Sequence, residues 1–458
     1  TLQQYEIVSD AIPRAQFLAF LESKVRGKPA AERADVFREH MAAWFPDLSA
    51  FNTDFGDQHN IRTREWSYKV SFANAGLLPN QIDMAIGDWL SALQVDDAKG
   101  QLIYCYVGPE SDAAAITQAT ERYLRSALSR LEAPGKGEAP IAITFLNDAA
   151  GTLGTKLAEY WILRQGLDER EKQRYANFIL DRTSQAEREI RTLFESLQRE
   201  CHIVPGTRRA ISRGPLVAML TALFEAVYPK AIPFPFDGYS TTSGNAAADC
   251  ALFTRQLFLG LFDREWIAAQ APRQKNRAVE VLQRAWGVLS DAGTLRILPA
   301  QSTLCSVVEF LEAQLQDERQ QNSVNLGTVL RLLCAPPYGC NLASAGLALA
   351  VFAGGHGETT QLRRNGTRVA REPWLNDALT RNVFTLSVLD ETDIVKVSED
   401  AQSEWERLLN AWEVEQTHEG KVSIGRKADE LHRRNPVPER LFYLYQSLCD
   451  RTQAAYGR

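Results

Sequence analysis

The segment LIYCYVG at residues 102–108 is a short, continuously apolar run, which is typical of a buried β-strand. A second run of this kind, IAITFLND, follows at 141–148. Between them, SDAAAITQATERYLRSALSRLE (111–132) has apolar residues at helical spacing, and Ser111 is its predicted N-cap. Strand, helix and strand at this spacing predict a parallel βαβ unit.

The segments around this unit predict helices and one more strand. Apolar spacing predicts helices within 1–45 and over 80–94, and alternation over 66–72 predicts a half-buried strand. A charged helix with one apolar stripe is predicted over 168–200, and we interpret it as a strut that joins the α/β part to the rest. Further helices are predicted over 213–232, 245–262, 273–290, 303–318, 325–333 and 341–353.

The last third of the chain has a different pattern. TTQLRRNGTRVA (359–370) predicts a β-hairpin with Asn365-Gly366 at its turn. A short predicted helix, EPWLNDALTR (372–381), and a strand-like run, VFTLSVL (383–389), follow. Helix, helix and hairpin together indicate a winged-helix-like unit. The helices predicted to close the chain span 398–414 and 438–456.

These elements predict an α+β protein that is predominantly helical. It has an N-terminal α/β part with a βαβ unit, a helical middle and a winged-helix-like C-terminal unit. Because 458 residues are too many for one compact core, several domains are expected. The predicted boundaries are 1–166 for the α/β domain, 167–212 for the long connecting helix, 213–340 for the helical domain, 341–395 for the winged-helix-like unit and 396–458 for the C-terminal helices.

Composition narrows the class of protein. With 51 basic and 57 acidic residues the net charge is −6, which gives no global basic footprint for nucleic acid. No apolar run reaches membrane-spanning length, so no membrane partner is predicted. Seven cysteines at wide spacing predict reduced thiols and a cytoplasmic protein. The chain opens TLQQYEIVSD without an initiator Met, and we expect it to be part of a longer protein.

Motifs for chemistry are weak. GTLGTK (151–156) follows a strand and opens a helix, but its spacing is not that of a P-loop, which favours an ordinary turn. The cluster FGDQHN (55–60), with Asp57 and His59 and with Asp54 directly before it, could hold an acid–base pair, but a solvated loop is the commoner structure for such residues. The scattered histidines and cysteines do not have zinc-ligand spacing. We therefore predict no catalytic, cofactor or metal residue in this chain.

The predicted hairpin carries a basic cluster. Arg363, Arg364 and Arg368 surround its turn and are candidate contacts to duplex DNA, since a basic wing can bind phosphates. A solvated hairpin in a protein–protein module is the favoured alternative, because the chain as a whole is acidic.

The stretch CAPPYGC (334–340) has a readable structural role. Pro336 and Pro337 fix φ and force the preceding residues out of a helix, and Gly339 permits a tight turn. Asn341 or Ser344 can then cap the next helix, whose small residues allow close packing. We predict a structural corner of Pro336, Pro337, Tyr338 and Gly339 between two buried helices.

The PPYG corner followed by a small-residue helix resembles the large P-loop ATPases of bacterial BREX-type anti-phage defence systems, the BrxC/PglY group. LFEAVYPKAIPFPFDG (223–238) and QRAWGVLSDAGTL (283–295) are similar to segments of those proteins, as is the helix–hairpin–helix order after 341. The family's P-loop and Walker B strand are not recognisable here, so no nucleotide-contacting residue is carried over. The resemblance implies the part of such an ATPase that is C-terminal to its nucleotide-binding half.

Three functions follow as hypotheses. The first is a non-catalytic C-terminal region of a defence ATPase that couples nucleotide state to partner binding; ATP and Mg²⁺ are then expected only if an upstream P-loop module exists. Its partners would be other defence proteins or further copies of the chain. The second is a DNA-binding module acting through the winged-helix-like unit. The third is an α/β enzyme with Asp148 at a strand end, where such folds place ligands, although a turn or capping role is favoured for Asp148.

Overall fold

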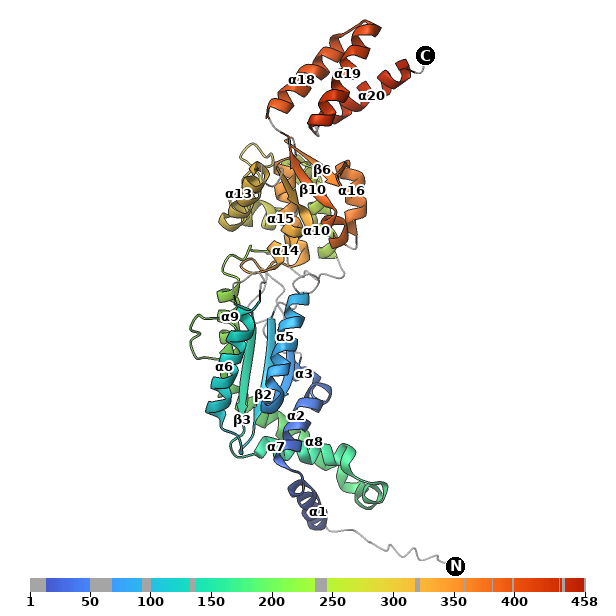
Figure 1. The fold of residues 1–458 in the computed structure, drawn as a ribbon. Helices are drawn as coiled ribbons and strands as arrows, with labels where there is room; N and C mark the ends of the chain where they lie inside the picture. The colour runs from blue at the N-terminus through green and yellow to red at the C-terminus, as the bar shows by residue number, and fades with distance from the viewer. Residues whose placement is uncertain are drawn as a thin grey trace, which may run out of the picture. The chain divides into compact units, whose positions relative to one another are not determined.

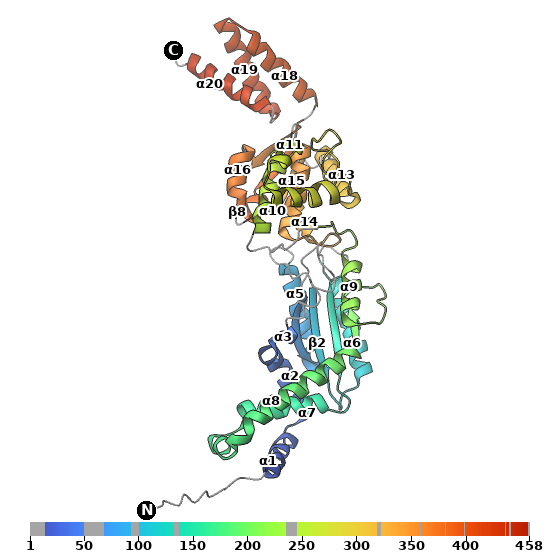
Figure 2. The ribbon, with the colours of Figure 1, turned by 180° about the vertical axis from the view of Figure 1, so that it is seen from behind.

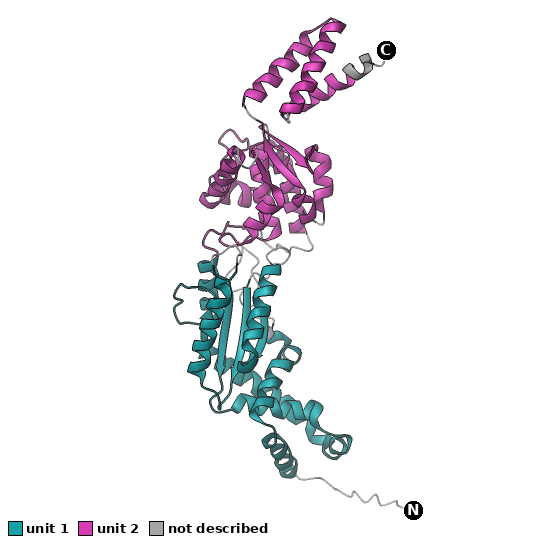
Figure 3. Cartoon of the chain, in the orientation of Figure 1, with its two compact units in different colours: residues 1–59, 66–92, 98–227 teal, residues 60–65, 93–97, 228–458 magenta. Residues whose placement is uncertain are grey.

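The computed structural model confirms an α+β chain that is predominantly helical. The residues that it describes fall into two compact units, the first ending at Val227 and the second beginning at Tyr228 (Figure 3). The described residues are 14–49, 68–92, 100–131, 137–234, 245–317, 322–357, 359–380, 382–397, 399–435, 437–438 and 441–456. The FGDQHN cluster lies outside them.

A four-stranded sheet forms the centre of unit 1. Its strands, in spatial order, are β1 (Tyr68–Asn74), β2 (Gly100–Val107), β3 (Ile141–Asn147) and β4 (His202–Pro205). The first three are parallel, with Ile103 of β2 opposite Ile143 of β3, and β4 is antiparallel. The predicted βαβ unit is therefore confirmed. Its helix is capped by Asp112, which accepts from the N–H groups of Ala114 and Ala115, so the Ser111 N-cap was wrong.

Helices cover both faces of this sheet, and for that reason every residue of β2 is buried. Helices α5 and α6 lie on one face, and α2, α7 and α8 lie on the other (Figures 1 and 2). The helices of unit 1 are α1 (Arg14–Arg26), α2 (Ala30–Trp44), α3 (Pro46–Ser49), η1 (Ala75–Leu77), α5 (Leu78–Ala92), α6 (Ala113–Ser129), α7 (Thr152–Trp161), the π-helix η2 (Ile162–Gly166), α8 (Glu169–Arg199) and α9 (Leu216–Val227).

Helix α8 is the predicted charged helix, and it packs entirely within unit 1. A capping box starts it: Asp168 accepts from the N–H of Glu171, whose carboxylate accepts from the N–H of Asp168. Its first part packs on α1, where the rings of Tyr175 and Phe17 lie 5.2 Å apart. Its last part packs on the sheet through Phe194. The backbone of Tyr175 is not helical, so α8 is kinked there; at a rise of about 1.5 Å per residue, the contacts at Tyr175 and Phe194 lie about 28 Å apart along the helix.

Unit 2 is built around a buried helix, α15 (Leu342–Gly355), capped by Asn341. Every residue from Ala343 to Ala353 is buried. The other helices of unit 2 are α10 (Asn245–Phe258), α11 (Arg264–Ala269), α12 (Pro272–Ala278), the π-helix η3 (Val279–Ala285), α13 (Ser302–Gln316), α14 (Leu326–Cys334), α16 (Arg371–Ala378), α17 (Leu386–Asp390), α18 (Glu399–Val414), α19 (His418–Arg434) and α20 (Phe442–Tyr456). Small side chains on α15 let α10 and the aromatic ring of Phe384 approach closely.

The second sheet contains the predicted hairpin. Its strands, in spatial order, are β5 (Ser323–Asn325), β10 (Thr392–Lys396), β6 (Thr360–Arg364) and β7 (Thr367–Arg368), and a separate pair joins β8 (Leu379–Thr380) to β9 (Val383–Phe384). The turn residues Asn365 and Gly366 have φ of 50° and 77°, as a two-residue hairpin with a primed turn requires.

Two features of the predicted C-terminal unit differ from the structure. The strand over 383–389 was wrong, because only its first two residues pair as β9 and the helix α17 begins at Leu386. The winged-helix-like unit of 341–395 is not established. Strand β5, which precedes that range, belongs to the same sheet, and further elements lie between the hairpin and β10.

Helices α18, α19 and α20 close the chain around Trp405 and Trp412. Among the described residues, contacts of Arg368 and Gln361 join the hairpin sheet to this bundle. The Arg368 guanidinium stacks on the Phe442 ring, and the Gln361 side-chain amide donates to the Val437 carbonyl at 3.2 Å.

A buried carboxylate predicts how the stability of unit 2 depends on pH. Burial acts to raise the pKa of Asp249, but hydrogen bonds from Arg273, Arg277 and Gln274 outweigh it and lower the pKa below 3.8. A carboxyl whose pKa is lower in the folded than in the unfolded state stabilises the protein at pH values above the unfolded-state pKa. This stabilisation is lost as the pH falls through the folded-state pKa.

We therefore expect Asp249→Asn to lower the free energy of unfolding by about 3 kcal/mol near neutral pH. The difference from wild type should shrink as the pH falls from about 4 toward the lowered folded-state pKa, because the Asp249 carboxyl of the unfolded wild-type chain takes up a proton in this range. Denaturant unfolding of both proteins across this range measures it. A difference that is constant down to about pH 2 would contradict the assignment.

Candidate functional site

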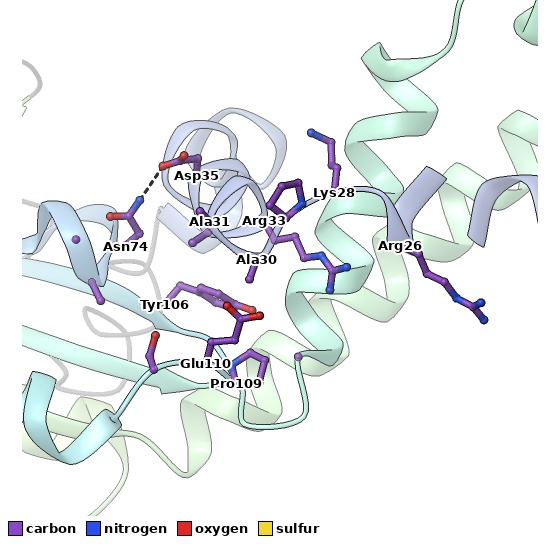
Figure 4. A pocket seen from close by; sticks show the side chains of 17 residues that line it. Arg26, Lys28, Ala30, Ala31, Arg33, Asp35, Asn74, Tyr106, Pro109 and Glu110 are labelled. Atoms are coloured by element: carbon purple, nitrogen blue, oxygen red, sulfur yellow. Dashed lines mark hydrogen bonds between the residues drawn. The ribbon is translucent and has the colours of Figure 1, made fainter. Parts of the chain in front are cut away.

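A pocket of about 640 Å³ opens in unit 1 where the parallel strands end (Figure 4). Asn74 ends β1, Gly108 follows β2, and Gly151 begins the turn into α7, so three strand ends contribute to it. The remaining wall comes from the end of α1 and the first turns of α2, including Arg33. Open α/β sheets bind their ligands at this carboxyl edge.

Asp148 organises the floor beside the pocket. It is 4% exposed and follows β3 directly. Its carboxylate accepts from the N–H groups of Thr152 and Gly154, each at 2.9 Å, and from the Tyr106 hydroxyl at 3.0 Å. Burial and the nearby Asp148 raise the pKa of Tyr106, so its hydroxyl stays protonated and donates. Asp148 is thus the cap of α7, and its oxygens are used within the fold.

The glycines of GTLGTK serve this packing. Gly151 has φ of 67°, which a side chain would strain, and Gly154 lies where a Cβ would come within 2.2 Å of the Tyr106 hydroxyl oxygen. The turn therefore presses α7 against Tyr106. With the Asp148 carboxylate bound to the first N–H groups of α7, the helix end that would hold a phosphate in a P-loop already holds an anion.

Lys156 is directed into an ion network between α7 and α8. Its ammonium lies 3.0 Å from Glu159 and 2.7 Å from Glu189. Glu159, which is 5% exposed, also pairs with Arg182 of α8. The lysine therefore ties two helices together. Residues 151–156 do not fit the phosphates of ATP, and no step of a reaction is assigned to them.

Arg33 is the cation of the pocket that sequence reasoning missed. Its Nη1 donates to the Thr155 hydroxyl at 3.3 Å and its Nη2 to the Val25 carbonyl at 3.2 Å. Its Nε is buried and has no hydrogen-bond partner among the described residues. Arg33 does not belong to a recognisable sequence motif, since it comes from a helix that precedes the sheet. Only its place on the face of α2 nearest the strand ends could have indicated a binding role.

The three arginines predicted to contact DNA interact with other side chains of unit 2. Arg364 donates to Glu391 at 2.8 Å and lies 3.7 Å from Asp377. Arg368 stacks on Phe442, and Arg363 donates to Gln361 at 3.4 Å. The structure brings these three arginines together, but on a hairpin that contacts neighbouring acids and the C-terminal bundle.

The residues of the predicted corner lie between α14 and α15. The peptide bond between Pro336 and Pro337 is cis, and the Pro337 carbonyl accepts from the N–H of Lys230 at 3.0 Å. Gly339 has φ of 63°, and a Cβ there would come within 2.6 Å of the Tyr228 ring. The corner thus packs against the Tyr228–Lys230 segment at the start of unit 2.

We expect Gly339→Ala to lower the free energy of unfolding by about 2–4 kcal/mol, because it adds both backbone strain and a clash with a buried ring. Gly366→Ala is a useful comparison: Gly366 also has positive φ, but a Cβ added there would meet nothing within 4 Å. Urea unfolding should show a larger loss for Gly339→Ala. Equal losses would mean that the contact with Tyr228 contributes nothing.

The described residues do not form a metal site, and two of the buried thiols are held protonated. No group of three or more His, Cys, Asp or Glu side chains gathers there as metal ligands would. Burial raises the pKa of Cys105 and of Cys250 to about 12, so these thiols stay protonated and unreactive at neutral pH. Over the same residues, no helix is both long and apolar enough to span a membrane.

Comparison with known proteins adds no relative. No protein-family model, no curated protein and no solved structure matches the chain.

Proposed function

We propose that this chain is a non-catalytic region of a bacterial anti-phage defence ATPase, and that it couples the nucleotide state of the whole protein to the binding of partner proteins. The observation that carries the proposal is the ion network that fixes α7 to α8. Lys156 and Glu159 come from the helix that follows β3, and Arg182 and Glu189 come from the middle of α8. A displacement at the strand ends is then passed to α8.

Helix α8 suits the role of a lever. Aromatic contacts at Tyr175 and Phe194 fix one part of it to α1 and another to the sheet, about 28 Å apart along the helix axis. Lys24 of α1 adds an ion pair with Glu171 at 2.6 Å. The helical part of α8 that follows the kink at Tyr175 is packed at both ends, and such an element can transmit a small shift from one end to the other.

Unit 2 supports a protein-binding role in preference to DNA binding. Its elements α13, β5, α14, α15, β6 and β10, with sheet order β5-β10-β6, follow each other as in a winged helix, but β7, α16, β8, β9 and α17 lie between β6 and β10. The helix that would enter a DNA groove in that comparison is α15, whose residues 343–353 are all buried. A helix surrounded by protein cannot read base edges. Together with the paired arginines of the hairpin, this favours a module that packs against protein.

The test uses the natural gene product with its neighbour-encoded proteins. ATP turnover is measured first, and partner capture is then compared in ATP and in ADP. We expect capture to depend on the nucleotide, and Glu159→Gln to abolish that dependence while ATP turnover persists. The control is Arg125→Gln, which removes an exposed pair on α6. Capture that is the same in both nucleotides, or a protein without ATP turnover, would overturn the proposal.

A further inference from the structure

We propose that the pocket beside Arg33 binds a phosphomonoester, a small molecule carrying a terminal phosphate, with Arg33 as its principal anchor. This site is separate from the coupling network and goes beyond the function proposed above. Three observations support the proposal: the cavity itself, its position at the ends of the parallel strands, and the lack of an ion-pair partner for Arg33 among the described residues.

The cavity has the size and place of a ligand site. Its volume of about 640 Å³ lies within the range of pockets that hold metabolite-sized ligands. It is formed at the ends of three parallel strands, where α/β proteins bind phosphate-bearing ligands. Gly151 contributes to its preformed shape, because a Cβ at that position would come within 3.2 Å of Pro109 across the cavity wall.

Arg33 is distinguished from the other cations of the lining by its partners. Lys28 pairs with Glu32 at 2.7 Å and lies over the Trp161 ring. Arg26 pairs with Glu22, and in Figure 4 its side chain points away from the rest of the lining. Within the described residues Arg33 forms no ion pair and donates only two long hydrogen bonds to neutral oxygens.

A half-buried guanidinium held by neutral acceptors favours an incoming anion. Desolvation disfavours its charge, and a phosphate would restore the lost solvation through paired N–H···O bonds. The planar guanidinium matches a phosphate more closely than an ammonium does. The N-termini of α6 and α7 already hold the carboxylates of Asp112 and Asp148, which leaves Arg33 as the anchor for a phosphate.

The acidic residues of the lining indicate which chemical groups the ligand carries beyond its phosphate. Asp35 accepts from the Asn74 side-chain amide at 2.8 Å, as the dashed line in Figure 4 marks. Glu110 and Ser111 are exposed on the loop that follows β2. Their oxygens can accept from hydroxyl groups attached beyond the phosphate. An ester that carries hydroxyl groups therefore fits better than inorganic phosphate alone.

The test is titration calorimetry on the whole 458-residue chain at low salt. The probes are inorganic phosphate, ribose 5-phosphate and AMP, with citrate as a carboxylate. We expect saturable binding of at least one ester, and at least about tenfold weaker binding in Arg33→Gln. Arg33→Lys keeps the charge but not the paired geometry, and should weaken binding severalfold. Arg125→Gln, on an exposed helix face, should bind as wild type does.

Glu110→Gln sharpens the result, because removing a negative charge beside a bound anion should tighten binding. Hydrogen exchange of α2 establishes that each variant is folded. No saturable binding of any ester at millimolar concentration would overturn the proposal, as would Arg33 variants that are folded and bind normally. Citrate or inorganic phosphate binding as tightly as the esters would overturn the assigned ligand class.

Discussion

Replacing Glu159 with glutamine is expected to lower the free energy of unfolding of unit 1 by about 3 kcal/mol. The carboxylate is 5% exposed and lies between Arg182 of α8 and Lys156 of its own helix. An amide of the same shape leaves both cations without this partner. Glu189 still pairs with Lys156 at 2.7 Å, so the loss should fall at the low end of the range for broken buried pairs.

Hydrogen exchange of the amides in α7 and α8 measures the lower stability of Glu159→Gln in the two helices that the carboxylate joins. The matched control is Glu189→Gln, whose side chain is 31% exposed and whose effect should stay below about 1 kcal/mol. Similar protection in the two variants would mean that Glu159 does not hold the helices together. Coupling through α8 would then need another route.

The second large effect is expected at Arg371, which is 5% exposed in the core of unit 2. Its Nη1 donates to the carbonyls of Phe258 and Ala353, each at 2.9 Å, and its Nη2 donates to the Thr360 hydroxyl at 3.1 Å. One side chain thus satisfies carbonyl groups at the ends of α10 and α15 and fixes the first residue of β6. Arg371→Met leaves these buried acceptors without a donor, at a cost of about 3–5 kcal/mol.

Arg371→Lys keeps the positive charge but loses the planar arrangement of the guanidinium donors, so it tests the two contributions separately. A single ammonium cannot reach all three acceptors, so it should recover only part of the lost stability. Thermal unfolding, followed through the tryptophans, compares the three proteins. A methionine variant within about 1 kcal/mol of wild type would show that water or backbone adjustment satisfies these carbonyls.

Long periodic segments predicted the fold well. The buried strands at 102–108 and 141–148, the helix between them, the charged helix and the Asn-Gly hairpin are all present. Short strands were missed, because HIVP of β4 and TDIVK of β10 have too few residues to show a period. Helix α19 was missed because it is polar over most of its length and packs through a few residues, among them Leu431.

The candidate pocket could not be predicted from sequence in the same way. Its residues come from α1, α2, β1 and two later turns, which meet only in the folded sheet. Lys156 illustrates the same limit: the spacing of GTLGTK argued against a P-loop, but only the folded structure shows that the carboxylates of Glu159 and Glu189 determine where the lysine points. Such pairings depend on helix packing, which no local spacing encodes.

The burial of α15 has a consequence for synthesis on the ribosome. The core that encloses it includes residues of α10, which is made earlier, but also Phe384 and the β10 residue Ile394, which are made later. The apolar segment can therefore be fully buried only after about 40 further residues have been synthesised, which takes roughly 2–8 seconds at ordinary elongation rates. During that interval it presents the kind of surface that chaperones bind. Slow translation after residue 355 should therefore favour aggregation of the nascent chain, whereas slow translation after residue 397 should not.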